Sequence, residues 1–361
     1  MQREPTVLRK VVWSLVATAA VLVFLEGLAS LVVAVRDAPA LVQDGFATQR
    51  KLYLHDPDLG WRPTPGVRVE DCFGAGATLT INAQGHRGTA ETTAEAPADR
   101  YRIAFLGDSF TMGYGVGDEQ TFPHQASALV PQIESVNMGV SGYGLDQIYL
   151  AYVRDGEKVD ADLVVCSVIE DDLRRTLTDR FAQRYDKPRL EVVGEEAFVR
   201  NVPVPDRGAP SNTALKLTAF AHRLSLARLL PEREAAASAR TGAAEAWQSV
   251  AEFALRDLSI RCRNAGRAFV VVYLPTHDDV IKRTSSASRW LERFSLRHDV
   301  PFVDLTSAFD GCSAAERKQQ FRLKEGDGHY TPEGNRRIAR ALLQQLSKRV
   351  PGFLTPARRA G

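Results

Sequence analysis

A serine and an Asp-x-His triplet, far apart in the sequence, could together perform nucleophilic catalysis. Residues 101–106 form an apolar run that predicts a short buried strand, and this strand leads into a Gly-Asp-Ser triplet that ends at Ser109. Open α/β sheets place their ligand sites at the carboxyl ends of the strands, so the Ser109 hydroxyl is a candidate nucleophile. Near the C-terminus, His329 could act as its base, and Asp327 could orient the imidazole.

His277 is the rival to His329 as the base, because it follows another predicted strand and would also lie at the carboxyl end of the sheet. It could instead contact substrate. Asp278 and Asp279 adjoin it, but one histidine with two adjacent aspartates has no recognised spacing of metal ligands. The glycines of residues 113–117 have the wrong offsets for a dinucleotide-binding loop. The sequence therefore predicts neither a metal nor a cofactor.

These residues resemble the SGNH/GDSL hydrolase family, and the resemblance covers roughly residues 50–350. The family carries its nucleophile in Gly-Asp-Ser, which matches Ser109, and it carries Asp and His near the end, which match Asp327 and His329. A second block of the family supplies a glycine whose backbone N–H helps to bind the oxyanion, and Gly142 matches it. The resemblance implies that the backbone N–H groups of Ser109 and Gly142 hold the oxyanion.

The third block departs from the family pattern. The family usually shows Asn-Asp after a strand, and the Asn side chain donates to the oxyanion, whereas here the strand at 162–169 precedes Glu-Asp-Asp with Asp171 at the Asn position. A carboxylate there would repel the oxyanion by about 4 kcal/mol at an effective dielectric constant of about 20, as much as one oxyanion donor contributes. Asp171 could be protonated and donate, could be turned away and held by Arg174 or Arg175, or could leave the site weak or inactive.

Apolar runs alternate with amphipathic stretches over residues 101–350, which is typical of a parallel α/β sheet. The strands are expected at 101–106, 133–137, 162–169, 267–274 and 301–305. The helices are expected at about 120–130, 144–157, 246–264, 286–298 and 332–348. The family resemblance implies the SGNH hydrolase fold, a flavodoxin-like three-layer sandwich with a parallel sheet, here preceded by one N-terminal transmembrane helix.

The chain divides into four predicted parts. A cytoplasmic stub and transmembrane anchor occupy residues 1–36, a β-rich lead-in and linker occupy 37–100, the hydrolase-like domain spans 101–350, and a tail covers 351–361. The lead-in is expected to be a structural cap on the sheet edge. An insertion at about 173–240 interrupts the α/β pattern and contains a predicted hairpin. The insertion could form a lid or a substrate-binding arm over the site, or a side wall that only packs.

Residues 11–35 form an apolar stretch that is long enough to cross a bilayer. A secretory signal has a shorter apolar core of about 7 to 15 residues, so an uncleaved anchor is favoured, although residues 38–40 leave cleavage open. The basic residues Arg3, Arg9 and Lys10 precede the stretch and predict a cytoplasmic N-terminus. The catalytic domain would then be periplasmic or extracellular.

Glu26 lies near the middle of this stretch, where a charge costs about 2.5 to 3.5 kcal/mol on insertion scales. It could be protonated, with the apolar residues around it driving insertion. It could instead mark a contact with another membrane protein, because Gly27, Ser30 and Ala34 are small residues that would let a partner helix approach.

The composition is that of an ordinary globular protein, with 44% hydrophobic and 25% charged residues. The net charge of +2 and the scattered basic residues give no electrostatic reason to propose a nucleic-acid partner. The four cysteines show no C-x-x-C spacing, so a zinc or thioredoxin-like site is not expected. Cys72 and Cys312 could pair if the domain lies outside the cytoplasm.

The sequence as a whole predicts a membrane-anchored serine ester hydrolase of SGNH type. Ser109 would attack an ester carbonyl, His329 would take its proton, and water would resolve the acyl-enzyme. The predicted location and the resemblance imply O-acyl groups on envelope or exported glycans as the substrate. Two alternatives stay open. One is an O-acyltransferase that passes the acyl group from the same site to a sugar hydroxyl, and the other is a glycan-binding protein with a decayed site.

Overall fold

The computed structural model of the protein describes residues 13–28, 52–181, 185–206, 235–283, 285–322 and 328–355, without the side chains of 235–245. The chain forms two compact units. The first comprises Met1–Asp44 and Arg207–Thr241, and the second comprises Gly45–Asp206 and Gly242–Gly361. The second unit contains the sheet and the candidate site.

A five-stranded parallel sheet, in the order β13-β12-β7-β5-β6, forms the centre of the second unit. Its strands are β5 (Tyr101–Leu106), β6 (Ile133–Asn137), β7 (Leu163–Val168), β12 (Ala268–Tyr273) and β13 (Phe302–Asp304). Every residue of β5 and β7 is buried, as expected for central strands that are covered on both faces. The predicted α/β fold with a parallel sheet is confirmed.

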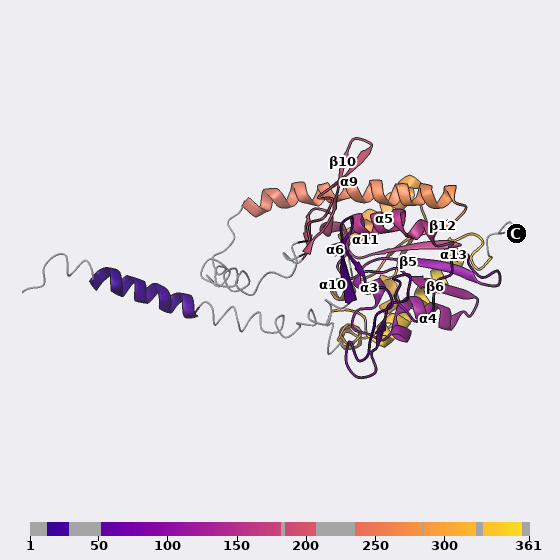
Figure 1. The fold of residues 1–361 in the computed structure, drawn as a ribbon, viewed down its shortest axis with the longest axis horizontal. Helices are drawn as coiled ribbons and strands as arrows, with labels where there is room; N and C mark the ends of the chain where they lie inside the picture. The colour runs from indigo at the N-terminus through magenta and orange to yellow at the C-terminus, as the bar shows by residue number, and fades with distance from the viewer. Residues whose placement is uncertain are drawn as a thin grey trace, which may run out of the picture. The chain divides into compact units, whose positions relative to one another are not determined.

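Helices cover both faces of this sheet, so the unit has three layers (Figure 1). One layer contains α4 (Phe122–Leu129) and α13 (Pro332–Arg349). The other contains α5 (Leu145–Arg154), α9 (Ala235–Asn264) and α11 (Ser286–His298). The alternation of side chains along a strand divides the core. Ile103 and Phe105 pack with the first layer, and Ala104 and Leu106 pack with the second.

Short elements surround the sheet. Four antiparallel pairs join β1 (Tyr53–Asp56) with β2 (Gly60–Pro63), β3 (Arg68–Val69) with β4 (Leu79–Thr80), β8 (Arg180–Phe181) with β9 (Tyr185–Asp186), and β10 (Arg189–Val193) with β11 (Glu196–Arg200). The short α-helices are α3 (Ser109–Met112), α6 (Glu170–Arg175), α10 (His277–Lys282) and α12 (Ala314–Gln319). Single 3-10 turns are η1 (Asp118–Gln120), η2 (Gly156–Lys158) and η3 (Thr306–Phe309). The pair β10–β11 is the hairpin predicted within the insertion.

The predicted membrane segment is described only in part. Residues 13–28 form a helix with exposed apolar side chains, such as Trp13 at 62% and Phe24 at 70%. Residues 11, 12 and 29–35 lie outside the described residues, as do Ser30 and Ala34 of the predicted contact face. Among the described helices, none is both long and apolar enough to cross a membrane. The transmembrane anchor therefore stays a prediction.

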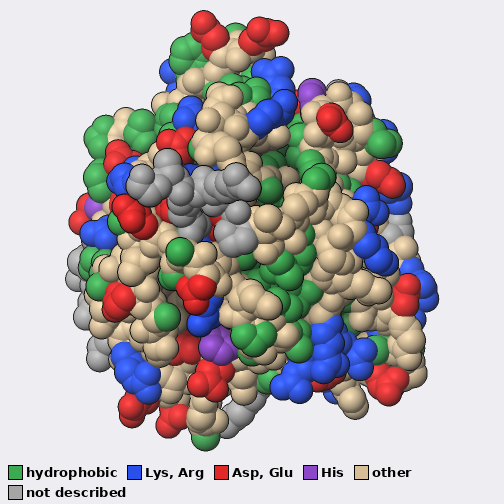
Figure 2. Space-filling view, turned by 90° about the vertical axis from the view of Figure 1, so that its right-hand side faces the viewer, with side chains coloured by type: hydrophobic (Ala, Val, Ile, Leu, Met, Phe, Trp, Pro, Cys, Tyr) green, Lys and Arg blue, Asp and Glu red, His purple; other side chains and the backbone are tan. Residues whose placement is uncertain are grey.

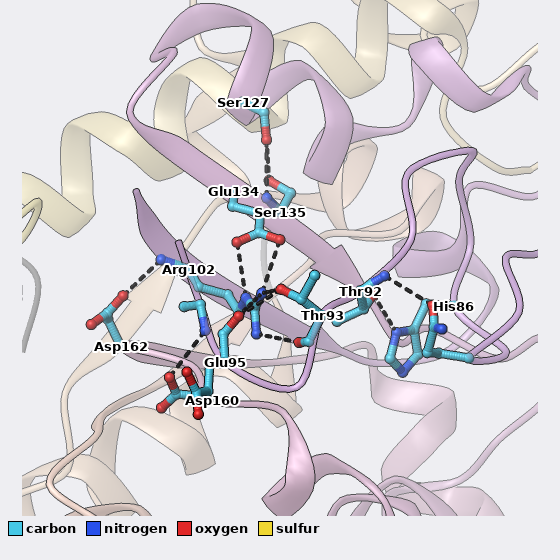
Figure 3. A network of polar contacts seen from close by, with 12 residues as sticks. His86, Thr92, Thr93, Glu95, Arg102, Ser127, Glu134, Ser135, Asp160 and Asp162 are labelled. Atoms are coloured by element: carbon cyan, nitrogen blue, oxygen red, sulfur yellow. Dashed lines mark hydrogen bonds and ion pairs between the residues drawn. The ribbon is translucent and has the colours of Figure 1, made fainter. Parts of the chain in front are cut away.

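A buried arginine ties the linker to the end of the sheet where the strands begin (Figure 3). The Arg102 guanidinium binds both oxygens of Glu134, at 2.9 and 3.1 Å, and donates to the carbonyls of Thr93 and Glu95. Asp162 accepts the Arg102 backbone N–H at 2.8 Å. Because each of these donors has a partner, the charge of Arg102 is compensated although its side chain is fully buried.

The side of the unit that carries the described C-terminal residues faces the viewer in Figure 2. On it, acidic and basic side chains are interspersed around a band of hydrophobic ones (Figure 2). No single sign of charge dominates this face, in keeping with the formal net charge of +2. The thiol of Cys312 is free, so the possible Cys72–Cys312 disulfide is not formed.

Candidate active site

The proposed nucleophile lies at a tight turn between β5 and α3. Ser109 is the first residue of α3, and the Asp108 side chain caps this helix by accepting the Phe110 N–H at 2.9 Å. A Cβ atom at Gly107 would lie 2.1 Å from Thr111 Oγ1 and 2.9 Å from the Ser167 carbonyl oxygen. Only glycine therefore fits between the strand and the helix, and the turn presents Ser109 at the carboxyl end of the sheet.

His329 meets this serine from the other end of the chain. Ser109 Oγ and His329 Nε2 are 2.8 Å apart, which is within the distance of a hydrogen bond between a nucleophile and its base. The imidazole packs against the rings of Phe110 and Tyr114, with centroids 4.7 and 5.0 Å away. Tyr330 fixes the same segment by donating its hydroxyl to the Pro275 carbonyl at 2.7 Å. The structure thus brings the predicted nucleophile and the predicted base together.

The two other residues predicted to act with Ser109 are Asp327 and His277, and neither is seen in contact with it in the part of the chain that the structure describes. Asp327, predicted to orient the imidazole, lies outside the described residues, so its role stays a prediction. His277, the rival base, is 39% exposed and contacts the Asp278 carboxylate and the Phe321 ring. Among the described residues, no group of His, Cys, Asp or Glu side chains is arranged to hold a metal ion.

The loop that follows β6 carries the predicted oxyanion glycine. Gly142 has a φ of +81°, and a Cβ atom there would lie 2.7 Å from a ring atom of Phe181, so the position requires glycine. The Val140 N–H donates to the Gly107 carbonyl at 3.0 Å, which joins this loop to the turn before Ser109. Gly142 is therefore held at the same end of the sheet as the nucleophile.

The lead-in also contacts this loop, which the sequence did not indicate. Trp61 donates its indole N–H to the Ser141 carbonyl at 3.0 Å, and Tyr143 donates its hydroxyl to the Trp61 carbonyl at 2.5 Å. The lead-in was expected to be a cap on the sheet edge. Its Arg87 N–H does bond to the edge strand β6, at the Asn137 carbonyl, with a distance of 2.9 Å. In addition, it supports the loop of Gly142 through hydrogen bonds that span about 80 positions of the sequence.

The described part of the insertion packs on the same loop. The Phe181 ring lies against Gly142, and the Trp61 ring is 5.8 Å from it. Lys187 and Asp146 form a fully buried ion pair at 2.6 Å, just after the loop. Burial raises the pKa of Asp146 and lowers the pKa of Lys187, while each charge opposes the shift in its partner. This pair fixes the insertion beside the site, and the choice between lid and side wall stays open.

Asp171 occupies the first turn of α6 but does not enter the buried part of the site. It is exposed and makes no hydrogen bond or ion pair with another described residue. Arg174 pairs with Glu170, and Arg175 binds other carboxylates. Neither arginine forms a hydrogen bond with Asp171, although the charge of Asp171 contributes to the raised pKa of Arg175. The role of Asp171 therefore stays a prediction.

The buried carboxylate of α6 is Asp172, the next residue. Arg175 Nη1 donates to Asp172 Oδ1 at 2.6 Å, to Asp108 Oδ2 at 3.1 Å and to the Tyr143 carbonyl at 3.0 Å. Burial, together with the charge of Asp108, raises the pKa of Asp172 well above its usual range. Burial lowers the pKa of Arg175, but the two carboxylates together outweigh it and raise that pKa. Two carboxylates thus share one guanidinium group behind Ser109.

Comparison with known proteins gives one family and several distant structures. The sequence model described as the GDSL-like Lipase/Acylhydrolase family matches residues 105–337. An α/β hydrolase enzyme from the metagenome of Lake Arreo, Spain, is 15% identical, with a TM-score of 0.41, over 70% of this chain and 97% of that one. A catalytic mutant of the acetylxylan esterase Axe2 from Geobacillus stearothermophilus is 15% identical, with a TM-score of 0.40, over 71% and 96%. No curated protein matches the chain.

Proposed function

This chain belongs to the GDSL-like lipase/acylhydrolase family and is an ester-hydrolysing enzyme, and from this premise we propose that it cleaves O-acyl esters of envelope or exported glycans through an acyl-enzyme. One observation carries the mechanism, namely the 2.8 Å contact between Ser109 Oγ and His329 Nε2. A serine hydroxyl is a weak nucleophile at neutral pH and needs an adjacent base. We infer that His329 is this base.

In the proposed reaction, Ser109 Oγ bonds to the ester carbonyl carbon while its proton passes to His329 Nε2. The carbonyl oxygen becomes an oxyanion, which accepts hydrogen bonds from the backbone N–H groups of Ser109 and Gly142. The alcohol then leaves with the proton from His329, and the acyl group stays on Ser109. A water molecule then gives a proton to His329 while its oxygen attacks the acyl carbon. The bond from that carbon to Ser109 Oγ breaks, His329 returns the proton to Ser109, and the acid leaves.

The proposed glycan substrate is supported by the predicted location and by the aromatic side chains beside Gly142. Phe181 and Tyr185 are both half-buried, and each ring is within 6 Å of the Trp61 ring, centroid to centroid. These rings give a bound ester an apolar wall next to the oxyanion loop. The same wall would accept an acylated sugar or a simple aryl ester, so both serve as test substrates.

Anchoring and location form part of the proposal. Residues 11–35 would cross the membrane with the N-terminus in the cytoplasm, and the catalytic domain would be periplasmic or extracellular. The apolar length and the preceding basic residues support this topology. Extraction of cell membranes with alkaline carbonate and protease digestion of intact spheroplasts test it. Release of the protein from the membranes by carbonate would contradict the anchor. A catalytic domain that resists protease added to intact spheroplasts would contradict its location outside the cytoplasm.

The catalytic proposal is tested with the purified full-length chain on p-nitrophenyl acetate, p-nitrophenyl butyrate and an O-acetylated oligosaccharide. Ser109→Ala should lose at least about 10³-fold in kcat, as expected when a nucleophile is removed. Ser347→Ala, on the exposed face of α13, is the matched control and should keep the wild-type rate. Acyl transfer to a glycan in place of hydrolysis would identify an acyltransferase. Glycan binding that survives Ser109→Ala, with no turnover in either form, would identify a decayed site.

A further inference from the structure

Arg175 contacts both halves of the candidate site through one nitrogen atom. We propose that Arg175 is a positioning residue for ester hydrolysis, whose guanidinium neutralises the Asp108 carboxylate beside Ser109 and fixes the oxyanion loop at Tyr143. The proposal rests on the proposed function. It starts from three hydrogen bonds of Arg175 Nη1, to Asp108 Oδ2 at 3.1 Å, Asp172 Oδ1 at 2.6 Å and the Tyr143 carbonyl at 3.0 Å.

The first step of the argument concerns the proton of Ser109. Its Oγ is 2.8 Å from His329 Nε2 and 3.2 Å from Asp108 Oδ2, so the hydroxyl has two acceptors within reach. Catalysis requires the proton to go to His329. An uncompensated carboxylate would be the stronger competitor, because ionised acceptors form the stronger hydrogen bonds. Arg175 binds the same Oδ2 atom and so weakens Asp108 as an acceptor for Ser109.

The second step concerns the charge that grows during the reaction. Asp108 and Asp172 are buried, with side chains 1% and 0% exposed, and Arg175 is 20% exposed. Charges interact strongly when water is excluded. Without Arg175, the buried Asp108 carboxylate beside Ser109 would be uncompensated, close to an oxyanion that the backbone donors must stabilise. The guanidinium opposes this repulsion.

The third step concerns the loop of Gly142. Arg175 donates to the carbonyl of Tyr143, the residue that follows Gly142. Its guanidinium carbon also lies 5.3 Å from the centre of the Phe181 ring, and that ring covers Gly142. A single side chain therefore links the helix cap of the nucleophile with the loop that carries the second oxyanion donor.

A double-mutant cycle separates neutralisation of Asp108 from a purely structural role. The variants are Arg175→Met, Asp108→Asn and the double variant, because Asn keeps the helix-capping oxygen but has no charge. Arg174→Met is the control, since Arg174 is exposed and pairs only with Glu170 among the described residues. Arg175→Lys, which keeps the positive charge, serves if Arg175→Met fails to fold by circular dichroism.

Two readouts are needed, so that failure of the inference differs from failure of the proposed function. The first is kcat and KM for p-nitrophenyl acetate. The second is the second-order rate of Ser109 labelling by a fluorophosphonate, which needs no ester substrate. Arg175→Met should lower kcat and the labelling rate by about 10²-fold, the lower range for loss of one charge-stabilising group. KM should change little, and Arg174→Met should match the wild type.

The cycle then decides the inference. Asp108→Asn in the Arg175→Met background should raise both rates by about 10-fold, since the charge that Arg175 opposes is gone. Arg175→Lys should keep most of the activity. Additive losses in the double variant, or wild-type rates in Arg175→Met, would overturn the inference. A wild-type enzyme that is labelled but hydrolyses no ester would overturn the proposed function. The labelling rates of the variants would then still test the role of Arg175. A wild type that is neither labelled nor active would overturn both.

Discussion

A fully buried arginine and a half-buried one lie at opposite ends of the same parallel sheet, and their surroundings differ. Arg102, where the strands begin, binds the Glu134 carboxylate through both Nε and Nη2. Its guanidinium also donates to backbone carbonyls. Arg175, where the strands end, shares one nitrogen between two carboxylates and a carbonyl. In the first arrangement one positive charge pairs with one negative charge, which suits a structural role. The second places two acidic side chains on one guanidinium beside Ser109, and burial together with the charge of Asp108 raises the pKa of Asp172, a perturbation of the kind found at functional sites.

The comparison predicts that changes where the strands end affect rate, while changes where they begin affect stability. His329→Ala gives the largest expected effect, a loss of kcat of about 10³-fold or more, because Ser109 loses its base. His124→Ala, on an exposed turn of α4, is the control and should keep wild-type kcat. The measurement is steady-state hydrolysis of p-nitrophenyl acetate. A full loss in His277→Ala with activity kept in His329→Ala would assign the base to the rival histidine.

Arg102→Met should instead lower the free energy of unfolding by about 3 kcal/mol, because it leaves the Glu134 carboxylate unpaired at a largely buried position. Urea denaturation followed by circular dichroism measures this loss, and kcat of the folded fraction should stay at the wild-type value. Arg100→Met, at an exposed position two residues away, is the matched control. A variant that lost activity without losing stability would break the comparison between the two ends.

Trp61→Phe should have a smaller effect at the catalytic end. It keeps the ring but removes the indole N–H that donates to the Ser141 carbonyl at 3.0 Å. Loss of one such hydrogen bond costs about 1 kcal/mol, and we expect a fall in kcat of a few-fold because the loop of Gly142 loosens. Trp247→Phe makes the same change at a ring that packs on Trp290, away from the site, and serves as the control. Unchanged kcat in Trp61→Phe would show that the lead-in is only a cap.

The remaining expected effect is confined to acidic pH and comes from His86, which belongs to the network in Figure 3. Burial lowers the pKa of His86 to about 4 in the folded state, against about 6.5 in the unfolded chain. Between these values the unfolded state binds more protons, so the free energy of unfolding falls as the pH falls through this window. His86→Gln should therefore show a shallower fall of Tm from pH 6.5 to pH 4. Parallel Tm curves for the variant and the wild type would contradict this.

The sequence predicted the parallel sheet because its signals are local. The apolar run at 162–169 is seen as β7, Leu163–Val168, and the turn after β5 presents Ser109 as the Gly-Asp-Ser triplet indicated. The pairing of Ser109 with His329 across 220 positions came from the family resemblance and not from periodicity.

The parts that the sequence did not reveal depend on packing between distant segments. Glu170, Asp171 and Asp172 are consecutive acidic residues at the start of one helix, and only the packing of α6 decides that Asp172 is the buried one. The link from Arg175 to Asp108 spans 67 positions, and the bond from Trp61 to Ser141 spans 80. A helical spacing of three residues between Asp172 and Arg175 was the one local signal of this network.

The central claim is that Ser109, activated by His329, is the nucleophile of an ester hydrolase. The most direct test labels the full-length enzyme with a fluorophosphonate, maps the adduct by peptide mass spectrometry, and compares ester turnover of the wild type with that of Ser109→Ala. The account predicts one adduct, on Ser109, formed at a rate that falls sharply in His329→Ala, together with loss of turnover in Ser109→Ala. An adduct on another serine, or turnover that survives Ser109→Ala, would contradict it.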